Sequence, residues 1–450
     1  MKQVTIAIVL LFSSFTIFAQ DLLEVYSEAK TQDPQFQAAG SAYQAIKESI
    51  PQARAALLPG VVLTARAGDI RQKTGEQAPS IFGSRDADQR YSSTSYNIEA
   101  NQPLFRYGDW VALRQAHASV RRGFALYTAE EQDLIRRTAS AYIVVLAARD
   151  TVNFAKAEQA AVGRQLKLVK ARRRGGLANS IDEQEALARF SRVEANVIEA
   201  DFILDDAFEG LMEIVGYRVR DVDAFSTDFP LVAPVPADVD HWLAQAQENN
   251  LSLIAANETV LVAMEEINRG RSSHYPTLDL VVRHGNVDSD QKLSEVTGSG
   301  NDVNTTEVAL EMSMPLYAGG AIRSVTRQAM RQHDQALSER DRQYRLVARE
   351  TRAAYQAIVR TISRVEALRT SVKAQNSVLT GKTKGFSSGV NTLFEVLDAE
   401  SDLYSTKREL ANAGYDYLLN MLRLKQQVGN LAESDLEAIN NLVVMAQATD

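Results

Sequence analysis

An internal repeat constrains the fold of this chain more than any other feature of its sequence. Motifs of the first half return in the second half in the same order, and residues 176–216 align without a gap on residues 389–429. Three motif pairs carry the repeat: Leu58-Pro59 with Tyr275-Pro276, Pro103-Leu104-Phe105 with Pro315-Leu316-Tyr317, and Thr138-x-x-Ala141-Tyr142 with Thr351-x-x-Ala354-Tyr355. Self-similarity of this kind marks a duplicated structural unit. We therefore expect one doubled structure, with a first repeat at residues 20–229 and a second at 230–450.

Each repeat ends in a long segment without proline. The ten prolines of the chain all lie outside residues 104–229 and 316–450. Both segments are rich in Ala, Leu, Arg, Glu and Gln, which favour helices, and their apolar residues recur at helical spacing. A single helix over Asp109–Arg173 would be about 98 Å long at 1.5 Å per residue. A rod of that length packs mainly against other rods.

The segment between the prolines of each repeat has a different pattern. Four short runs, separated by polar and Gly-rich loops, have the composition of strands: 61–71, 91–101, 278–285 and 304–314. From Thr305 to Met314, polar or small residues alternate with mostly apolar ones. This alternation is typical of a membrane barrel strand about ten residues long. We expect β-hairpins at about 61–101 and 277–314.

The pattern alone leaves two interpretations of the hairpins open. Each could be a soluble hairpin with one buried face, or part of a membrane barrel with its apolar side toward lipid. Two hairpins cannot close a barrel, and a bilayer does not tolerate open sheet edges. The membrane interpretation therefore requires several chains to contribute to one closed sheet.

The N-terminus predicts export. A charged start, Met1-Lys2, precedes an apolar stretch from Val4 to Phe18 and a small Ala19, which is the form of a secretory signal peptide over residues 1–19. No later stretch reaches about 18 uninterrupted apolar residues, so a membrane crossing would have to use strands. The chain has no cysteine, which excludes disulfides, thiolate metal sites and a lipid-anchoring cysteine. Its formal charge is −8, and its Lys and Arg residues are interspersed with Asp and Glu, so the basic patch of a nucleic-acid-binding protein is not visible.

The order of these elements resembles that of the TolC family of outer-membrane efflux proteins. Each half has the order helix, hairpin, very long helix, Gly turn, helix, and the resemblance covers nearly the whole mature chain. Its most specific motifs lie in the second repeat: Met314–Gly320 at the exit of the hairpin, Gly389–Ala399 at the Gly turn, and Asn412–Tyr417. Because it has no cysteine for a lipid anchor, the chain resembles the non-lipidated branch of this family.

The resemblance implies a fold, a location and partners. The fold is a membrane β-barrel plus a long α-helical barrel, made by a homotrimer in which four strands per protomer form one twelve-stranded barrel. A coiled-coil tunnel would continue this barrel into the periplasm. There it would dock on an inner-membrane pump together with a periplasmic adaptor (membrane fusion) protein. The location is the outer membrane, in contact with its lipid.

Two carboxylate pairs stand three residues apart near the start of an expected helix: Asp182 with Glu185, and Glu395 with Asp398. Acidic residues favour a helix N-terminus, which accounts for the pairs without any further role. By resemblance, Glu395 and Asp398 instead form the pore constriction of the tunnel. A threefold tunnel would make each carboxylate a ring of three, and such rings select cations.

The resemblance also implies a gate. Asp182 falls where the family holds its tunnel closed through an Arg and a Tyr of the second hairpin, and those two positions are here Asn391 and Phe386. The charged latch of the family therefore cannot form. We expect a weaker closed state, or a substitute latch from Lys384 or from residues 172–174.

The turns at Gly176 and Gly389 are the free tips of the expected hairpins, where an adaptor would dock. Near the second turn, residues 385–389 match the G-x-S-x-G elbow of serine hydrolases, with Ser387 as the nucleophile. The elbow requires a buried strand before it, whereas a polar helix end precedes this one, so a turn is the expected structure. The five histidines show no metal-ligand spacing, and no cofactor is expected.

The sequence thus favours a passive exit duct that carries solutes or proteins from an inner-membrane pump to the exterior in efflux or type I secretion. Two other classes fit parts of the pattern. One is a soluble periplasmic coiled-coil adaptor or scaffold, and the other is an exported hydrolase that uses Ser387.

Overall fold

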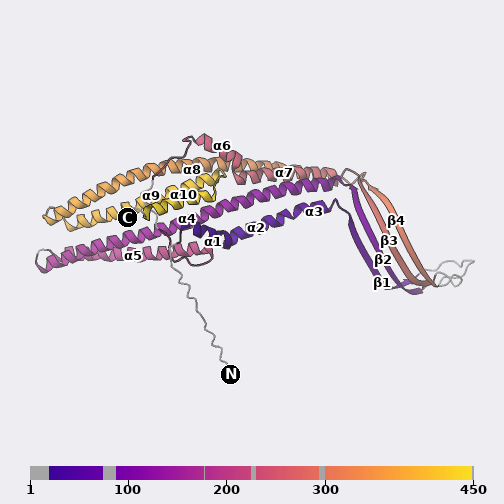
Figure 1. The fold of residues 1–450 in the computed structure, drawn as a ribbon, viewed down its shortest axis with the longest axis horizontal. Helices are drawn as coiled ribbons and strands as arrows, with labels where there is room; N and C mark the ends of the chain where they lie inside the picture. The colour runs from indigo at the N-terminus through magenta and orange to yellow at the C-terminus, as the bar shows by residue number, and fades with distance from the viewer. Residues whose placement is uncertain (1–19, 74–87, 177, 224–229, 293–298, 448–450) are drawn as a thin grey trace, which may run out of the picture. The chain divides into compact units, whose positions relative to one another are not determined.

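The computed structural model describes residues 20–73, 88–176, 178–223, 230–292 and 299–447 (Figure 1). The signal peptide expected at residues 1–19 lies outside these ranges. The elements follow in this order: α1 Leu22–Gln32, α2 Pro34–Lys47, α3 Ser49–Ala55, β1 Gly60–Lys73, β2 Asp88–Phe105, α4 Tyr107–Arg174, α5 Ser180–Val215, α6 Val239–Asn249, α7 Leu251–Ser272, β3 Thr277–Lys292, β4 Ser299–Ser313, α8 Ala321–Ser387, α9 Leu393–Gln427 and α10 Glu433–Gln447. Both halves therefore run from shorter helices through a hairpin to two long helices.

The chain forms two compact units, and each takes segments from both halves of the sequence. The helical unit consists of the described parts of Met1–Gly40, Tyr127–Leu253 and Tyr344–Asp450. The sheet unit consists of the described parts of Ser41–Leu126 and Ile254–Gln343. Each of the two expected repeats is thus divided between the units.

The sheet unit holds one antiparallel sheet in the order β1-β2-β3-β4. One row across it pairs Val61 with Ala100, Ala100 with Val282, and Val282 with Val308. These four side chains share a face, because partners in register point to the same side of a sheet. Val61 and Val308 are each 68% exposed, so this face is apolar and uncovered in the single chain.

The opposite face of the sheet is polar and tied by one arginine. Arg283 on β3 binds Glu99 on β2 at 3.0 Å, and Glu307 and Glu311 on β4 at 3.4 and 2.9 Å. Three carboxylates around one guanidinium join three neighbouring strands. The alternation expected from Thr305 to Met314 is therefore confirmed as one apolar and one polar face.

The expected strand length of about ten residues was wrong. The four strands have 14, 18, 16 and 15 residues. Backbone pairing continues past the point where the apolar alternation ends, for example at Gln72 with Gln89. The alternation reports only the part of a strand that has an apolar side, whereas hydrogen bonding sets its full length.

The two longest helices confirm the expected rods. α4 has 68 residues and α8 has 67, and each is followed by a turn and a shorter helix, α5 or α9. Among the described residues, no helix combines the length and the apolar character that a membrane span needs. The core of the helical unit contains large, fully buried side chains, including Tyr26, Leu134, Tyr142, Leu211 and Leu436.

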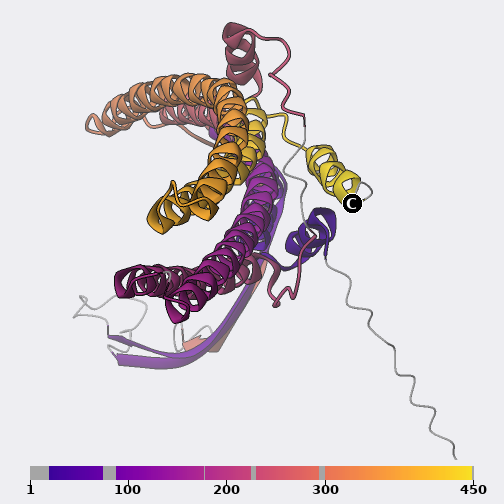
Figure 2. The ribbon, with the colours of Figure 1, turned by 90° about the vertical axis from the view of Figure 1, so that its left-hand side faces the viewer.

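Away from the turns, the four long helices of the helical unit lie in the order α8, α9, α4, α5 (Figure 1). On α9, the Tyr415 hydroxyl donates to Asp150 of α4 at 2.7 Å. On α4, Lys156 pairs with Asp201 of α5 at 3.0 Å. Figure 2, viewed from the side of the two turns, shows the α8/α9 hairpin beside the α4/α5 hairpin. Away from the turns, α8 and α5 are therefore the outer helices of this row.

Candidate functional site

The two hairpin turns are built on glycines in the left-handed conformation. Gly176 has a φ of 71° and Gly389 a φ of 79°, which L side chains rarely adopt. Within the described part of the chain, a Cβ at either position would meet no atom within 4 Å. The backbone conformation therefore selects glycine at both turns, and the expected Gly turns are confirmed.

Asp182 closes the start of α5. The Asn179 side chain accepts a hydrogen bond from the Asp182 backbone N–H at 2.8 Å, and the Asp182 carboxylate accepts one from the Asn179 N–H at 3.2 Å. This reciprocal pair is a capping box, which satisfies two otherwise unpaired donors at a helix start. Asp182 therefore lies at a helix start, and its role in a gate stays a prediction.

Glu395 has the same position at the start of α9, with one additional partner. Its carboxylate accepts hydrogen bonds from the Thr392 N–H at 3.0 Å and from the Asn391 side-chain amide at 2.7 Å. The hydrogen bond from Asn391, followed by that from Thr392, lowers the pKa of Glu395. A Cβ at Gly385 would collide with the Asn391 amide, so a larger residue there would require the Asn391 side chain to move. Asn391 thus supports its own turn.

Phe386 meets an arginine of the other hairpin. The Arg172 guanidinium of α4 lies over the Phe386 ring of α8, 4.5 Å from the ring centroid. This is a cation–π contact. Among the described residues, no hydrogen bond or ion pair joins Asp182 to Phe386 or Asn391, so the three expected gate residues do not meet in one chain. Arg172 lies in the run 172–174 that the sequence offered as a substitute.

Asp398 and Glu185 line a shallow groove between α9 and α5. The other lining residues are Ala188, Arg189, Arg192, Phe394 and Leu397. Two guanidiniums therefore lie in the same groove as two carboxylates. The Phe394 ring is 63% exposed, so the groove is apolar as well as charged. Glu395 and Asp398, which the sequence treats as a pair, thus have different surroundings in the single chain.

The hydroxyl of Ser387 donates to the Lys384 carbonyl at 2.7 Å, inside the last turn of α8. A helix end, not a strand, precedes this serine, so the elbow geometry of a hydrolase is not formed. In the parts of the chain that the structure describes, no three His, Asp or Glu side chains are grouped so as to hold a metal ion.

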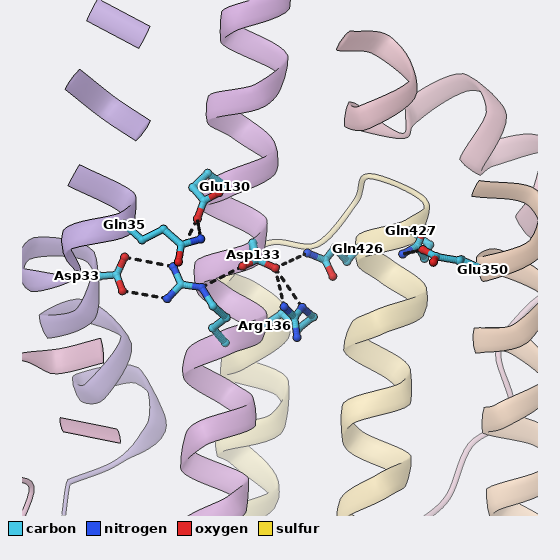
Figure 3. Close-up of polar contacts among 9 residues, drawn as sticks. Asp33, Gln35, Glu130, Asp133, Arg136, Glu350, Gln426 and Gln427 are labelled. Carbon is cyan, nitrogen blue, oxygen red and sulfur yellow. Dashed lines mark hydrogen bonds and ion pairs between the residues drawn. The ribbon is translucent and has the colours of Figure 1, made fainter. Parts of the chain in front are cut away.

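A cluster of polar side chains, which includes Asp33, Asp133 and Gln426, joins three segments of the helical unit (Figure 3). Arg137 on α4 binds Asp33, between α1 and α2, at 2.9 and 3.2 Å, and Asp133 at 2.9 Å. Asp133 also accepts from Arg136 at 2.7 Å and from Gln426 of α9 at 3.3 Å. No sequence signal identified this cluster, because residues that are hydrogen-bonded to each other in it lie up to 293 positions apart.

Hydrogen bonds keep the carboxylates of this cluster ionised. Burial opposes ionisation of Asp133, but hydrogen bonds and charge from Arg136, with Gln426 and Arg137, outweigh it and lower the pKa. Burial likewise opposes ionisation of Asp33, and the hydrogen bond from Arg137 and the Phe36 N–H outweigh it. Both pKa values lie below the usual aspartate value.

Between α9 and α4 lie carboxyl groups whose pKa values are raised instead of lowered. Burial raises the pKa of Asp150, against the effect of its hydrogen bond with Tyr415. Burial also raises the pKa of Glu400 on α9, and the nearby charge of Glu158 on α4 raises it further, while Arg164 acts against both. Glu158 is 3% exposed and Glu400 is 8% exposed. One Glu400 oxygen is buried without a hydrogen-bond partner among the described residues.

Known proteins are similar to this chain in fold and in sequence. The CmeC outer membrane channel of Campylobacter jejuni superposes with a TM-score of 0.77 at 14% identity, over 94% of this chain and 89% of that one. The sequence profile described as outer membrane efflux protein matches residues 25–217 and 242–430. The chain belongs to this outer membrane efflux protein family. The resemblance to the TolC family is thereby confirmed.

Relatives align with this outer membrane efflux protein along almost their whole length. The outer membrane protein TolC of Vibrio cholerae is 34% identical, over 95% of this chain and 94% of its own. The alkaline protease secretion protein AprF of Pseudomonas aeruginosa is 29% identical, over 94% of this chain and 87% of its own. The expected outer-membrane location and the function as an exit duct for efflux or secretion are confirmed. A soluble periplasmic scaffold is thereby set aside.

Proposed function

We propose that three copies of this chain form one continuous passive duct, with a twelve-stranded barrel in the outer membrane and a helical tunnel in the periplasm. One observation carries the proposal: a single chain supplies an open four-stranded sheet with an exposed apolar face. Its edge strands β1 and β4 each lack one neighbour within the described chain. Lipid would cover the face, and strands of other copies would pair with the edges.

The export role can be tested in cells. We expect deletion of the gene to raise sensitivity to small toxic solutes, or to remove proteins from the medium, and a plasmid copy to restore the wild-type state. The name of AprF supports a secreted-protein cargo, and the efflux family supports small solutes. A deletion strain with unchanged drug tolerance and an unchanged secreted proteome would contradict the proposal.

We also propose that Glu395 and Asp398 form the pore constriction. Repetition by threefold symmetry would form two rings of three carboxylates, about 4.5 Å apart along the helix, where a multivalent cation would bind. The hydrogen bonds that lower the pKa of Glu395 in the single chain would act against the rise that neighbouring carboxylates of the ring would cause. Trivalent metal ions should block conductance of the reconstituted trimer, and Glu395→Ala with Asp398→Ala should relieve the block. Unchanged block and unchanged cation selectivity in planar bilayers would reduce the pair to helix-start residues.

We propose that the gate closes through a contact that differs from the charged latch of the family. Asp182, Phe386 and Asn391 remain its positions, and the Arg172 guanidinium over the Phe386 ring supports a cation–π link between the two hairpins. Phe386→Ala should therefore increase conductance of the closed trimer, whereas Phe386→Tyr should not. Equal conductance of both variants and the wild type would exclude this link.

Energy for transport would come from partners. We propose that a periplasmic adaptor docks on the tips around Gly176 and Gly389 and connects the duct to an inner-membrane pump. The open space around both glycines supports an accessible docking surface. No cofactor takes part in this proposal, and the duct acts without chemistry of its own.

A further inference from the structure

The contact between α9 and α4, which we call the α9–α4 seam, joins the α8/α9 hairpin to the α4/α5 hairpin. It contains two glutamates that the proposed function does not use, Glu158 on α4 and Glu400 on α9. The two residues are only 3% and 8% exposed. Neither carboxyl group makes an ion pair or a hydrogen bond with another described residue, and one Glu400 oxygen is itself buried. A buried carboxylate without a partner is unfavourable, so the charge at this site depends on its surroundings.

An apolar cluster closes the same seam on the side of the Gly turns. It includes Val162 of α4 and Leu397 of α9, which are 1% and 4% exposed. Val162 lies four residues after Glu158, and Leu397 lies three residues before Glu400, which is about one helical turn in each case. The apolar cluster favours contact between the hairpins at any pH. The contribution of the neighbouring glutamates, in contrast, changes with their charge.

The charged neighbours of Glu400 do not compensate for its burial. Burial raises the pKa of Glu400, the charge of Arg164 on α4 lowers it, and the charge of Glu158 raises it again. Tyr404, four residues along α9, is the other titratable side chain beside it. Burial raises the pKa of Tyr404 too, so its hydroxyl is uncharged at neutral pH. Ionisation of Glu400 therefore adds a negative charge near Glu158 in a buried site.

Asp150 is a further acid of the α9–α4 seam, but it has a partner. Burial raises its pKa, and a hydrogen bond from the Tyr415 hydroxyl, at 2.7 Å, acts against this rise. That bond joins α9 to α4, and an amide in place of the carboxyl group could accept it as well. Ionisation of Asp150 is thus compatible with a closed seam, whereas ionisation of Glu400 is not compensated there.

We infer that Glu400 is a proton-operated lock between the two hairpins: its neutral form holds them together, and its ionised form, beside Glu158, favours their separation and opens the periplasmic end of the duct. This inference rests on the proposed duct and adds regulation by pH. It names the charge that changes and the seam that responds. The apolar cluster provides the attraction that the ionised form has to overcome.

The direction of the pH effect follows from the raised pKa of Glu400 in the closed seam. Such a group stabilises the closed state fully below the ordinary glutamate value, about 4.3, and the stabilisation is lost as the pH rises through the raised value. The duct is therefore most closed in acid. The ratio of open to closed duct rises by up to about tenfold per pH unit for each copy that releases one proton.

Conductance of the reconstituted trimer in planar bilayers tests the lock. Wild-type conductance should rise as the periplasmic side is titrated from about pH 4 to pH 8. Glu400→Gln, which has the same shape but cannot ionise, should stay near the acid level of the wild type. Glu158→Gln should reduce the rise, whereas the exposed Glu409→Gln should follow the wild type. The difference between Glu400→Gln and the wild type should persist when the proposed constriction is removed by Glu395→Ala with Asp398→Ala.

Labelling of a buried thiol gives a second measurement that does not depend on conductance. The chain has no natural cysteine, so Leu397→Cys introduces a single thiol at a position that is 4% exposed in the apolar cluster. A maleimide should modify this thiol faster when Glu400 is present than in combination with Glu400→Gln. The ratio of the two rates should grow with pH, up to about tenfold per pH unit. Ionisation of the thiol itself cancels in this ratio.

The outcomes separate this inference from the proposed function. If the trimer conducts but its conductance does not rise with pH, or rises equally in Glu400→Gln, the lock is wrong and the duct stands. Loss of the rise in Asp150→Asn but not in Glu400→Gln would assign the switch to Asp150 and also overturn the lock. If the trimer conducts at no pH, the proposed duct fails. The labelling ratio then still decides whether Glu400 controls the seam, and a ratio independent of pH would exclude it.

Discussion

The sheet unit and the helical unit place their apolar side chains in opposite ways. In the sheet unit, rows such as Val61, Ala100, Val282 and Val308 stand on an uncovered face. In the helical unit, Leu134, Tyr142 and Leu211 are among side chains that are fully buried within the chain. The helical unit thus forms its core from its own residues, whereas the sheet needs lipid and further strands.

The ion pairs of the two units also differ in exposure: those of the sheet are open to solvent, and those of the helical unit are more buried. Arg283 in the sheet binds three carboxylates on an open surface, with 34% of its side chain exposed. In the helical unit, Arg137 has 20% of its side chain exposed, and its partner Asp33 only 3%. Ion pairs at a surface contribute little to stability, whereas loss of one partner from a buried pair is strongly destabilising. Mutations in the sheet should therefore affect assembly, and mutations in the helical unit should affect folding.

The largest effect is expected from a charge on the apolar face of the sheet. Leu310→Arg should destabilise insertion by about 2–4 kcal/mol per copy at the bilayer midplane. Outer-membrane fractions should lose the trimer, while circular dichroism of the refolded chain retains its helical signal. Thr305→Arg places the same charge on the polar face of the same strand and should leave the trimer intact. Equal loss of trimer in both variants would mean that the faces do not differ.

The second effect is expected from the buried ion pairs of the helical unit. Arg137→Ala leaves Asp33 and Asp133 without their shared guanidinium and should lower the free energy of unfolding by about 2–4 kcal/mol. Urea unfolding followed by the helical signal measures this. Arg331→Ala, which removes an arginine that is 86% exposed from its pair with Asp334, should change it by less than about 0.5 kcal/mol.

The effect of Arg137→Ala should depend on pH in a defined direction. The pKa values of Asp33 and Asp133 are lowered in the folded state, so the stabilisation from them is present above their unfolded value, about 4. It is lost as the pH falls through the folded pKa. The difference between variant and wild type should shrink on acidification below about pH 4. If the difference in unfolding free energy stays constant to low pH, ionisation of Asp33 and Asp133 is not its cause.

These two regions also show what the sequence can and cannot predict. The long helices, the hairpins and the Gly turns follow from local rules: proline-free segments, alternation of period two, and glycine at a left-handed turn. The turns at Asp182 and Glu395 follow the same logic, because both capping boxes lie within four residues of chain. Strand ends did not follow, since backbone pairing outlasts the apolar alternation.

Contacts between distant segments were beyond local rules. Arg137 finds Asp33 across 104 positions, and nothing near either residue identifies the other. At the gate, the family pattern pointed to Asp182, Phe386 and Asn391, but Asn391 binds Glu395 of its own turn instead. The run 172–174 gave a partial signal for the arginine that reaches Phe386. Which of its three members makes the contact depends on how the two hairpins pack.

A third effect concerns the buried acid of the α9–α4 seam. Glu400→Gln removes a carboxyl whose pKa burial raises, and it should stabilise the chain by on the order of 1–3 kcal/mol at high pH. A raised folded pKa contributes stability below the unfolded value, about 4.3, and this contribution is lost as the pH rises through the folded pKa. The melting temperature of the variant should therefore exceed that of the wild type increasingly as the pH rises above about 4.3, until the pH has passed the raised folded pKa. The exposed Glu409→Gln is the control and should show no such trend.

The smallest effect on stability, with a large effect on function, is expected at the turns. Gly389→Trp forces a side chain into a left-handed conformation, which costs about 1–2 kcal/mol, and covers the tip where the adaptor would dock. Export should be lost in a complementation assay while the trimer remains in the membrane. Gly389→Asn, which tolerates this conformation, should retain export. Loss of the trimer in the Trp variant would assign the glycine to folding rather than docking.

The mass of the detergent-solubilised protein tests the central claim most directly, because the open sheet of one chain can become a closed barrel only by assembly. Multi-angle light scattering, corrected for bound detergent, should give three times the mass of the mature chain, and this ratio should persist on dilution. A monomeric mass in a sample that retains its strand signal would contradict the account. The exposed apolar face of the sheet would then need a different cover.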